Sequence, residues 1–210
     1  MIPKIIHQIW IGPLDPPMEW IDTWKKHHPA WQHILWNDKK IDELDLKNRK
    51  AYDYYYDKGI FNGSANVARY EILYRYGGLY VDADSTCLRS LDGAKFLKKD
   101  FFCCYSPNKV GRVSNTFLGS IKNHPFLADI IDGVSGLCEE DNLEPSWDTS
   151  GGTLLTRLIK YYPDIKPLSG RQFYGVDMQG KKIRGLGGRK YSVHHALTTH
   201  KNREQKKAKK

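Results

Sequence analysis

The stretch that most constrains the fold runs from Asn66 to Leu88 and reads NVARYEILYRYGGLYVDADSTCL. Apolar and aromatic side chains recur at helical spacing in its first half, and Gly77-Gly78 then supplies the left-handed backbone that commonly ends a helix. The apolar run 79–81 is typical of a buried strand. The sequence therefore predicts a helix, a glycine turn and an interior strand that ends at Asp82-Ala83-Asp84.

Two carboxylates end this predicted strand. Ligands of open α/β sheets bind outside the carboxyl ends of the strands. Residues two apart on a strand point to the same side, so Asp82 and Asp84 can converge on one cation. Mg²⁺ and Mn²⁺ prefer oxygen ligands, and Mg²⁺ is commonly held by one or two carboxylates together with substrate phosphates. We therefore expect a site for Mn²⁺ or Mg²⁺ that serves a nucleoside diphosphate.

The same stretch resembles the core of glycosyltransferase family 32, which includes capsular-polysaccharide and mannosyltransferase-like sugar transferases. The shared pattern, Arg-Tyr followed by I-L-Y-x-x-G-G-x-Y-x-D-x-D, is matched by Arg69, Tyr70, Leu73, Tyr74, Gly77, Gly78, Tyr80, Asp82 and Asp84. Asn66 stands where the family usually has Asp. The resemblance implies a GT-A fold, a single nucleotide-binding, Rossmann-like α/β domain with a mixed, mainly parallel sheet flanked by helices. It also implies a metal-dependent transfer of a sugar from a nucleotide-diphosphate donor, with a UDP-hexose favoured, to a glycan or other hydroxyl acceptor.

The chain opens with a predicted strand at 4–11, a helix at 17–27 and a second strand at 32–36, an order that favours a parallel sheet. A further strand is expected at 101–105, with helices expected at 47–58, 126–138 and 154–161. Residues 2–12 resemble the family's opening I-P-K-I-I-H-Q-I-W-x-G, which implies that Trp10 stacks on the nucleotide base. Without that resemblance, Trp10 is interpreted as a core residue.

The resemblance also assigns roles in donor binding. It implies that Arg69 adds positive charge near the donor and that Asn66 and Asp82 bond ribose or sugar hydroxyls. The segment NTFLGS before His124-Pro125 resembles a family segment, which implies that Asn115 contacts the donor sugar or a phosphate. A turn-capping role for Asn115 stays open.

A third metal ligand is expected near the end of the chain. Residues 191–200 read YSVHHALTTH and resemble a family segment Y-x-x-H-H followed by Ser-Trp, which Thr199-His200 replaces here. His194 is the candidate ligand beside Asp82 and Asp84, with His195 on the other face if the segment is extended.

The segment WDTSGGT at 147–153 is expected to be a polar turn that opens a helix. The amides of Gly151 and Gly152 could meet a phosphate or an acceptor hydroxyl. Asp148 is the candidate base on the acceptor, beside Asp84 and Arg69 in catalysis, although a helix cap is an equal interpretation. The resemblance implies retention of anomeric configuration, whereas a base at Asp148 suits inversion, so the stereochemistry stays open.

The 210 residues, 40% of them hydrophobic, suit one domain, placed at 1–200. Residues 201–210 carry six basic side chains and one acid, and hold five of the nine net positive charges. This tail is expected to be disordered, or a linker to further domains, with a possible peripheral contact to a membrane. The mildly basic remainder fits an enzyme that handles phosphates and does not call for nucleic acid as a partner.

The cysteines form no C-x-x-C pair and are expected to be buried free thiols, which indicates a reducing compartment. The sequence shows no signal peptide and no run of about 20 apolar residues, so we expect a cytoplasmic protein. Two rival functions stay open. One is a phosphohydrolase that uses the first Asp of D-x-D as nucleophile, and the other is a nucleic-acid-binding module driven by the tail. The stretch 185–188 is interpreted as a lid over the donor or a surface turn.

Overall fold

A five-stranded sheet organises the chain, in a computed structural model that describes residues 1–107, 110–140, 142–174 and 190–196. The strand order is β2-β1-β3-β6-β5, with bounds β1 Ile5–Ile9, β2 Gln32–Trp36, β3 Gly78–Val81, β5 Phe101–Tyr105 and β6 Val113–Ser120. β1 pairs in parallel with β2 and β3, whereas β6 is antiparallel to both β3 and β5. Four strands therefore run in one direction, which confirms the mixed, mainly parallel sheet.

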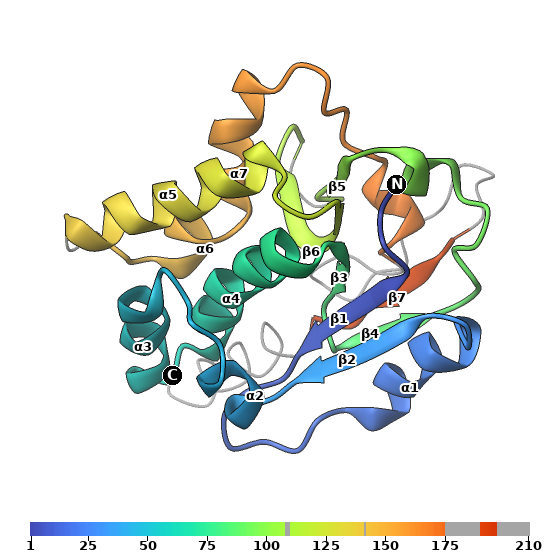
Figure 1. Cartoon of the computed structure of the whole chain (residues 1–210), viewed down its shortest axis with the longest axis horizontal. Helices are drawn as coiled ribbons and strands as arrows, with labels where there is room; N and C mark the ends of the chain where they lie inside the picture. Colours follow the sequence, from blue (N-terminus) through green and yellow to red (C-terminus); the bar gives the residue numbers. More distant parts are fainter. Residues whose placement is uncertain (108–109, 141, 175–189, 197–210) are drawn as a thin grey trace, which may run out of the picture.

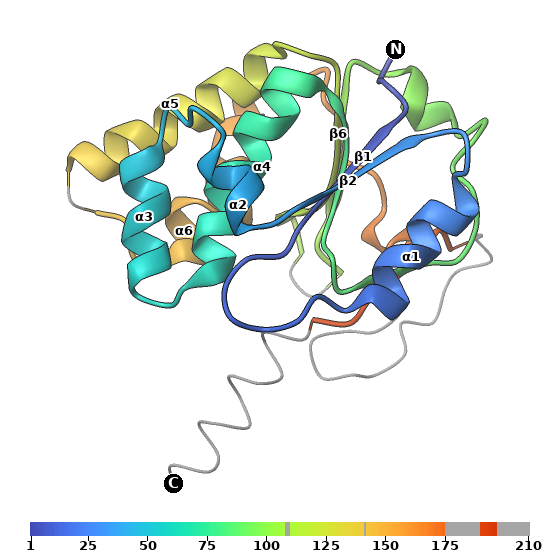
Figure 2. The same cartoon turned by 60° about the horizontal axis from the view of Figure 1, so that its bottom comes forward.

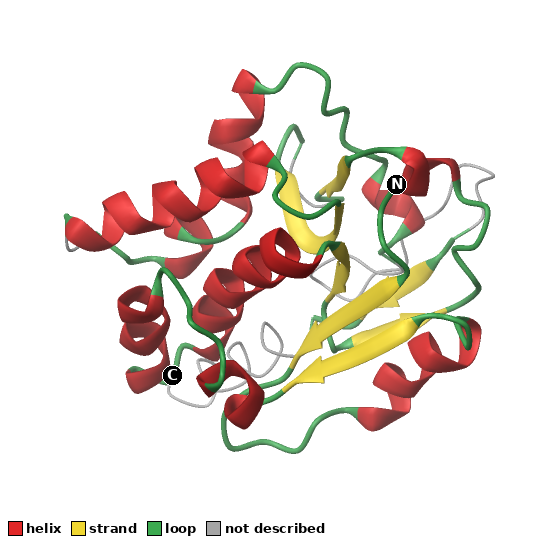
Figure 3. Cartoon of the chain, viewed as in Figure 1, coloured by secondary structure: helices red, strands yellow, loops and turns green. Residues whose placement is uncertain are grey.

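Helices cover both faces of this sheet (Figures 1 and 2). One face carries α3, α4 and α5, and the other carries α1, as Figure 2 shows with the sheet nearly edge-on. The helices are α1 Met18–His27, α2 Asp38–Asp42, α3 Arg49–Asp57, α4 Phe61–Tyr76, α5 Pro125–Glu139, α6 Ser146–Thr149 and α7 Gly152–Leu158, with short 3-10 turns at Lys95–Lys98, Ile159–Tyr161 and Gly170–Gln172. Figure 3 shows how loops join these layers. The arrangement is that of an α/β domain.

Successive side chains of each strand point to opposite faces of the sheet, so the core is divided into two clusters, one on each face. In β3, Tyr80 packs with the helices α3, α4 and α5, whereas Leu79 and Val81 pack with the aromatic cluster on the side of α1. That second cluster includes Trp24 and Phe117. Successive residues of a strand face opposite sides of a sheet, so a three-residue apolar run contributes to both cores.

The glycine turn predicted between helix and strand is present. Helix α4 ends at Tyr76, and Gly77 and Gly78 take φ angles of +65° and +97°. A Cβ on Gly78 would lie 2.6 Å from the backbone oxygen of Ile5, so this residue also allows β3 to approach β1. Both the left-handed backbone and the close approach require glycine here.

Two local predictions are corrected by the structure, and one strand is present that the sequence analysis did not predict. Asn115 lies inside strand β6, which pairs with β3, so it does not cap a turn. The expected turn at 147–153 contains helix α6, and the following helix α7 begins at Gly152 and ends at Leu158. Residues 85–87 form strand β4, Ser85–Cys87, which pairs with β7, Ser192–His194, in a separate two-stranded sheet. Pairing partners distant in sequence decide each of these elements, and local propensity does not reveal them.

All four cysteines are free thiols, as expected, and Cys87, Cys103 and Cys104 are buried. Burial raises the pKa of the Cys103 thiol to about 12. Across the described part of the chain, no helix combines the length and the apolar character needed to cross a membrane. The stretch 185–188 and the tail 201–210 lie outside the described residues.

Candidate active site

A cavity of about 650 Å³ opens where β1 and β3 end. Its walls come from the loop after β1, from α4, from the start of β6, from α6 and from the segment after β7. Both Asp82 and Asp84 line it, in the position that the carboxyl end of a parallel strand predicts. Its volume lies within the range of about 300–1,000 Å³ that is usual for small-molecule sites.

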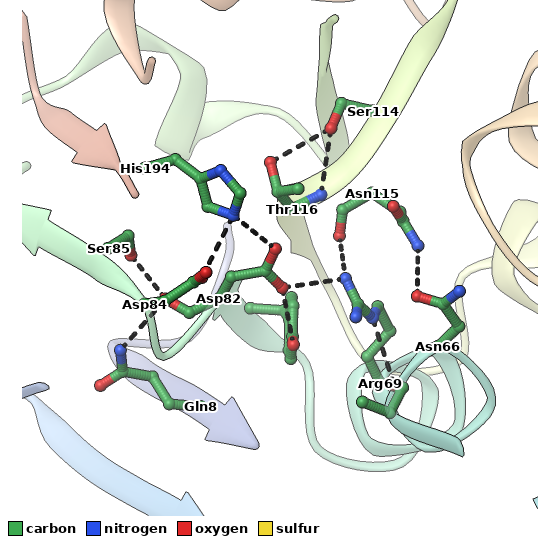
Figure 4. Close-up of polar contacts among 12 residues, drawn as sticks. Gln8, Asn66, Arg69, Asp82, Asp84, Ser85, Ser114, Asn115, Thr116 and His194 are labelled. Atoms are coloured by element: carbon green, nitrogen blue, oxygen red, sulfur yellow. Dashed lines mark hydrogen bonds and ion pairs between the residues drawn. The ribbon is translucent and has the colours of Figure 1, made fainter. Parts of the chain in front are cut away.

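Asp82, Asp84 and His194 converge in this cavity (Figure 4). The Nε2 atom of His194 lies 3.1 Å from Asp82 Oδ2 and 3.1 Å from Asp84 Oδ1. Strand β7 brings the histidine here, because Ser85 pairs with His194 and the His195 amide donates to the Asp84 carbonyl at 2.9 Å. The predicted triad is therefore assembled across more than 100 residues of sequence.

The triad fits a divalent cation. One ligand atom from each residue can be chosen so that all three lie within 4.8 Å of one another. Two ligands at right angles around a Mg²⁺-sized ion, each about 2.1 Å from it, are about 3 Å apart, which matches the separations from His194 to the two carboxylates. A set of two carboxylates and one imidazole suits Mn²⁺ or Mg²⁺ better than a thiolate-preferring metal.

The electrostatics of the triad favour positive charge at its centre. Burial lowers the pKa of His194, but the carboxylates of Asp84 and Asp82 outweigh burial and raise this pKa to about 10. The other oxygen of Asp82 accepts from Arg69 Nη1 at 3.1 Å and from the Tyr80 hydroxyl at 2.9 Å. Arg69 and Tyr80 thus orient the Asp82 carboxylate through one oxygen, while its other oxygen faces the centre of the triad.

Arg69, Asn66 and Asn115 form a polar wall beside the triad (Figure 4). The side chain of Asn115 donates to Asn66 Oδ1 at 2.9 Å and to the Tyr70 hydroxyl at 3.1 Å. Arg69 donates to the Asn115 carbonyl at 2.6 Å, which ties α4 to β6. The structure therefore brings these three predicted donor-binding residues together with the metal triad.

The remaining predicted residues divide into two groups. Trp10, Gly151 and Gly152 line the cavity, and Trp10 donates from its indole nitrogen to the Leu14 carbonyl at 2.7 Å. Asp148 does not line it and instead pairs with Arg157, at 2.9 Å between Asp148 Oδ2 and Arg157 Nη2. The structure thus separates this candidate base from the other predicted site residues.

The cavity also contains residues that the sequence did not single out. Arg112 and Trp147 line it on the side of β6 and α6, and Ser114 and Thr116 line it near His194. A tryptophan surrounded by polar residues, as in SWDTS, is a sequence signal that could have marked Trp147. Arg112 carries no such signal, because its position depends on the pairing of β6.

A mainly parallel sheet with a D-x-D carboxylate pair at the end of its third strand defines the GT-A class of glycosyltransferase folds. Residues 16–112 match the family described as "Glycosyltransferase sugar-binding region containing DXD motif". The match covers just under half of the chain, and it confirms the resemblance predicted from the sequence.

Two fungal proteins are among the similar sequences. "Inositol phosphoceramide mannosyltransferase 3" of Schizosaccharomyces pombe is 34% identical over 139 residues, which cover 62% of this chain and 36% of the relative. "Mannosyl phosphorylinositol ceramide synthase CSH1" of Saccharomyces cerevisiae is 34% identical over 148 residues, which cover 64% of this chain and 35% of the relative. The chain thus spans little more than a third of the length of these two relatives.

Solved structures share the fold. The PaToxG glycosyltransferase superposes with a TM-score of 0.63 at 17% identity and covers 78% of this chain and 70% of its own. The UDP-bound glycosyltransferase domain from the YGT toxin has a TM-score of 0.57 at 12% identity, and the match covers 80% of this chain and 79% of the toxin domain. At these identities the comparison establishes the GT-A architecture.

Proposed function

We propose that the chain transfers a sugar from a nucleoside-diphosphate donor to a hydroxyl group of a glycan or other acceptor, with the help of a bound Mn²⁺ or Mg²⁺. The convergence of Asp82, Asp84 and His194 in the cavity is the observation that carries the proposal. The family match over residues 16–112 supports the reaction class, and it also disfavours the phosphohydrolase and nucleic-acid-binding alternatives.

The metal is proposed to supply Lewis-acid stabilisation of the negative charge on the departing diphosphate. Asp84 and Asp82 would hold it through their carboxylates, and His194 would complete the set. Arg69 keeps the Asp82 carboxylate oriented and adds a buried positive charge beside it. These side chains are in place before substrate arrives, so little reorganisation is needed during the reaction.

The donor is proposed to lie along the wall formed by α4 and β6. Asn66 and Asn115 present amide groups there, which can both donate and accept hydrogen bonds to sugar hydroxyls. Apolar residues from β1, from the loop after it and from the start of α4, together with Trp10, line the part of the cavity suited to a base: Ile9, Ile11, Pro13, Leu14 and Phe61. The UDP-bound structural neighbour supports a uridine nucleotide, and the mannosyltransferase relatives support a hexose as the transferred sugar.

A thermal-shift screen of UDP, GDP and dTDP sugars, with and without Mn²⁺, tests the proposal. We expect one nucleotide series to raise the melting temperature in the presence of Mn²⁺ and to have a much smaller effect without it, because ligands that bind the native state stabilise it. Turnover of the stabilising donor then follows by release of the nucleoside diphosphate. A protein that responds to no nucleotide under either condition would refute the proposed function.

A further inference from the structure

An exposed aromatic side chain and a cation lie side by side at the edge of the cavity. Trp147 in α6 is 54% exposed, and Arg112 lies directly before β6; both line the cavity. The guanidinium carbon of Arg112 lies 5.5 Å from the centre of the Trp147 ring, and Arg112 Nη2 donates to the Trp147 carbonyl at 3.2 Å. The pair is held together by both its side chains and its backbone.

Two glycines fix the position of this pair. A Cβ on Gly151 would lie 2.7 Å from the Trp147 carbonyl oxygen, and a Cβ on Gly152 would lie 2.4 Å from the Val113 carbonyl oxygen. Contacts this short exclude a side chain, so the start of α7 packs directly against α6 and β6. The Trp147 indole and the Arg112 guanidinium are therefore presented to the cavity from a close-packed support.

Within the described part of the chain, no carboxylate balances the charge of Arg112, whose guanidinium contacts the carbonyl and the ring of Trp147. Among the described residues, the acids that line the cavity are Asp82 and Asp84, which are engaged with His194 and Arg69. A guanidinium has five N–H donors, so most of those on Arg112 have no partner among the described residues and can serve a ligand.

A second pocket, of about 440 Å³, continues from this edge and shares Ser106 with the cavity. Among the described residues that line it, none is acidic and one is a second arginine: Tyr105, Ser106, Pro107, Val110, Gly111, Pro167, Ser169, Gly170 and Arg171. The second pocket therefore adds space and a second positive charge next to Arg112, since it is lined by the adjacent Gly111 and by Arg171. The donor diphosphate is matched by the metal, so this basic region is left for a different anionic ligand.

We propose that Trp147 and Arg112 form an acceptor subsite that takes a saccharide carrying a phosphate group. The indole packs against the apolar face of the ring, and the guanidinium pairs with the phosphate through its planar fork of donors. The acceptor then enters past the second pocket with a free hydroxyl directed toward the donor. This inference rests on the proposed function, because it assigns the other substrate of the same reaction.

Calorimetric titration tests the subsite without requiring turnover. The protein is first saturated with Mn²⁺ and the nucleoside diphosphate found in the screen, so that phosphate cannot bind the metal. Glucose 6-phosphate and mannose 6-phosphate are then compared with their neutral methyl glycosides and with inorganic phosphate. We expect at least one sugar phosphate to bind at least about tenfold more tightly than its neutral partner and than inorganic phosphate, since hydrogen bonds to charged groups contribute about 1.5–3 kcal/mol.

Matched variants separate the two side chains. Arg112→Gln should remove the preference for the phosphorylated sugar, whereas Arg75→Gln, the same charge change outside the cavity, should keep it. Trp147→Ala should weaken binding of both the phosphorylated and the neutral sugar. Tyr161→Ala, at an aromatic residue that is 79% exposed, should leave the binding of both sugars unchanged. Arg112→Lys should retain part of the preference, because it keeps the charge and loses the planar fork.

Two results for the wild type would overturn the subsite: equal binding of phosphorylated and neutral sugars, or inorganic phosphate binding as tightly as the sugar phosphate. A third such result is that Trp147→Ala weakens binding of the nucleotide and leaves binding of the sugar unchanged. Each of them leaves the nucleotide and Mn²⁺ response of the screen intact, so the proposed function survives. If no nucleotide binds, the proposed function fails and the acceptor assignment falls with it. The titration without nucleotide then still shows whether Arg112 selects phosphate.

Discussion

Asp82 is the residue through which most of the candidate site is connected. One carboxylate oxygen accepts from Arg69 on α4 and from Tyr80 on β3, and the other faces His194 on β7. A single side chain thus joins a helix, the central sheet and the last described strand. Asp84 has a more direct relation to the proposed metal, because its carboxylate faces the same imidazole from the loop between β3 and β4.

Replacing Asp84 by Asn should abolish Mn²⁺-dependent binding of the donor and lower turnover by at least about 10²-fold. A neutral amide is a weaker ligand for a hard cation, and several kcal/mol of charge stabilisation are lost. Titration calorimetry of nucleotide with and without Mn²⁺ measures the effect. Asp22→Asn, an exposed residue on α1, serves as the control. Wild-type Mn²⁺ dependence in Asp84→Asn would show that the metal is held elsewhere.

Replacing Trp10 by Ala should weaken nucleotide binding by about 5- to 100-fold, because stacking on a base contributes about 1–3 kcal/mol in single-stranded nucleic-acid systems. Trp10→Phe should recover much of the affinity, since it keeps an aromatic face but not the hydrogen bond to the Leu14 carbonyl. Dissociation constants of the nucleoside diphosphate provide the measurement. Identical constants for all three proteins would return Trp10 to a purely structural role.

The buried side chain of His7 should make the stability of the protein depend on pH. Its ring is fully buried, with Nε2 2.9 Å from the Gly77 carbonyl and Nδ1 3.1 Å from the donating Trp36 indole nitrogen. Both contacts are satisfied by the neutral ring with its proton on Nε2, and burial lowers the pKa from 6.5 to about 4. As the pH falls, His7 is therefore protonated in the unfolded chain before it is protonated in the folded protein. The contribution of neutral His7 to the free energy of unfolding is complete above pH 6.5 and declines toward pH 4.

The free energy of unfolding should consequently decrease by about 2 kcal/mol more in the wild type than in His7→Gln between pH 7 and pH 5. Glutamine offers one donor and one acceptor but does not titrate. Urea denaturation at the two pH values measures both proteins, and taking the difference cancels the other histidines. Parallel changes in the two proteins would contradict the assignment of a neutral buried imidazole.

At the scale of elements, the helix α4 and strand β3 set the geometry of the site. Arg69 and Asn66 project from α4, and Asp82 directly follows β3, so the glycine turn between them controls how these residues meet. The helix is buried on most of its surface, between the sheet and the neighbouring α3 and α5. A helix packed on most of its surface holds its side chains more rigidly than a surface helix could.

Replacing Gly78 by Ala should lower the free energy of unfolding by at least about 2 kcal/mol, because φ is +97° and the new Cβ would lie 2.6 Å from the Ile5 carbonyl oxygen. Gly136→Ala in α5 is the matched control. Nothing lies within 4 Å of its Cβ position, so alanine should stabilise this helix by about 0.5–1 kcal/mol. Urea denaturation measures both, and equal stabilities for the two variants would argue against the strained turn.

At the scale of the whole molecule, the site depends on contact between the middle and the end of the chain. The two-stranded sheet of β4 and β7 carries His194 to Asp82 and Asp84, and Trp20 on α1 stacks on His195 with ring centres 4.1 Å apart. The Thr86 hydroxyl also lies 2.8 Å from His195 Nε2. These contacts attach the histidine pair to both the sheet and the helix α1.

Ending the chain after residue 189 should therefore remove Mn²⁺-dependent nucleotide binding, whereas ending it after residue 200 should preserve it. Only the first change deletes β7 and His194, and both remove the basic tail. Thermal shifts with nucleotide and Mn²⁺ compare the two, and circular dichroism verifies that both retain their helices. Loss of binding in both proteins would instead place an essential contact in residues 201–210, as the nucleic-acid-binding alternative requires.

The sequence by itself determined the elements that local chemistry specifies. Gly77-Gly78 predicted the end of α4, the apolar run 79–81 predicted a strand, and the spacing of Asp82 and Asp84 predicted carboxylates at its end. The β-α-β opening likewise predicted parallel strands. Each of these features depends on residues close together in the chain, so backbone preferences and hydrophobic spacing are sufficient to predict it.

Only the tertiary structure decided how distant segments meet. It placed Asn115 in antiparallel β6, paired β7 with β4 so that His194 reaches the carboxylates, and directed Asp148 to Arg157 instead of the cavity. It also joined Arg112 and Trp147 into one subsite. Strand pairing and side-chain partners are chosen by packing across the whole fold, and a short window of sequence does not contain that information.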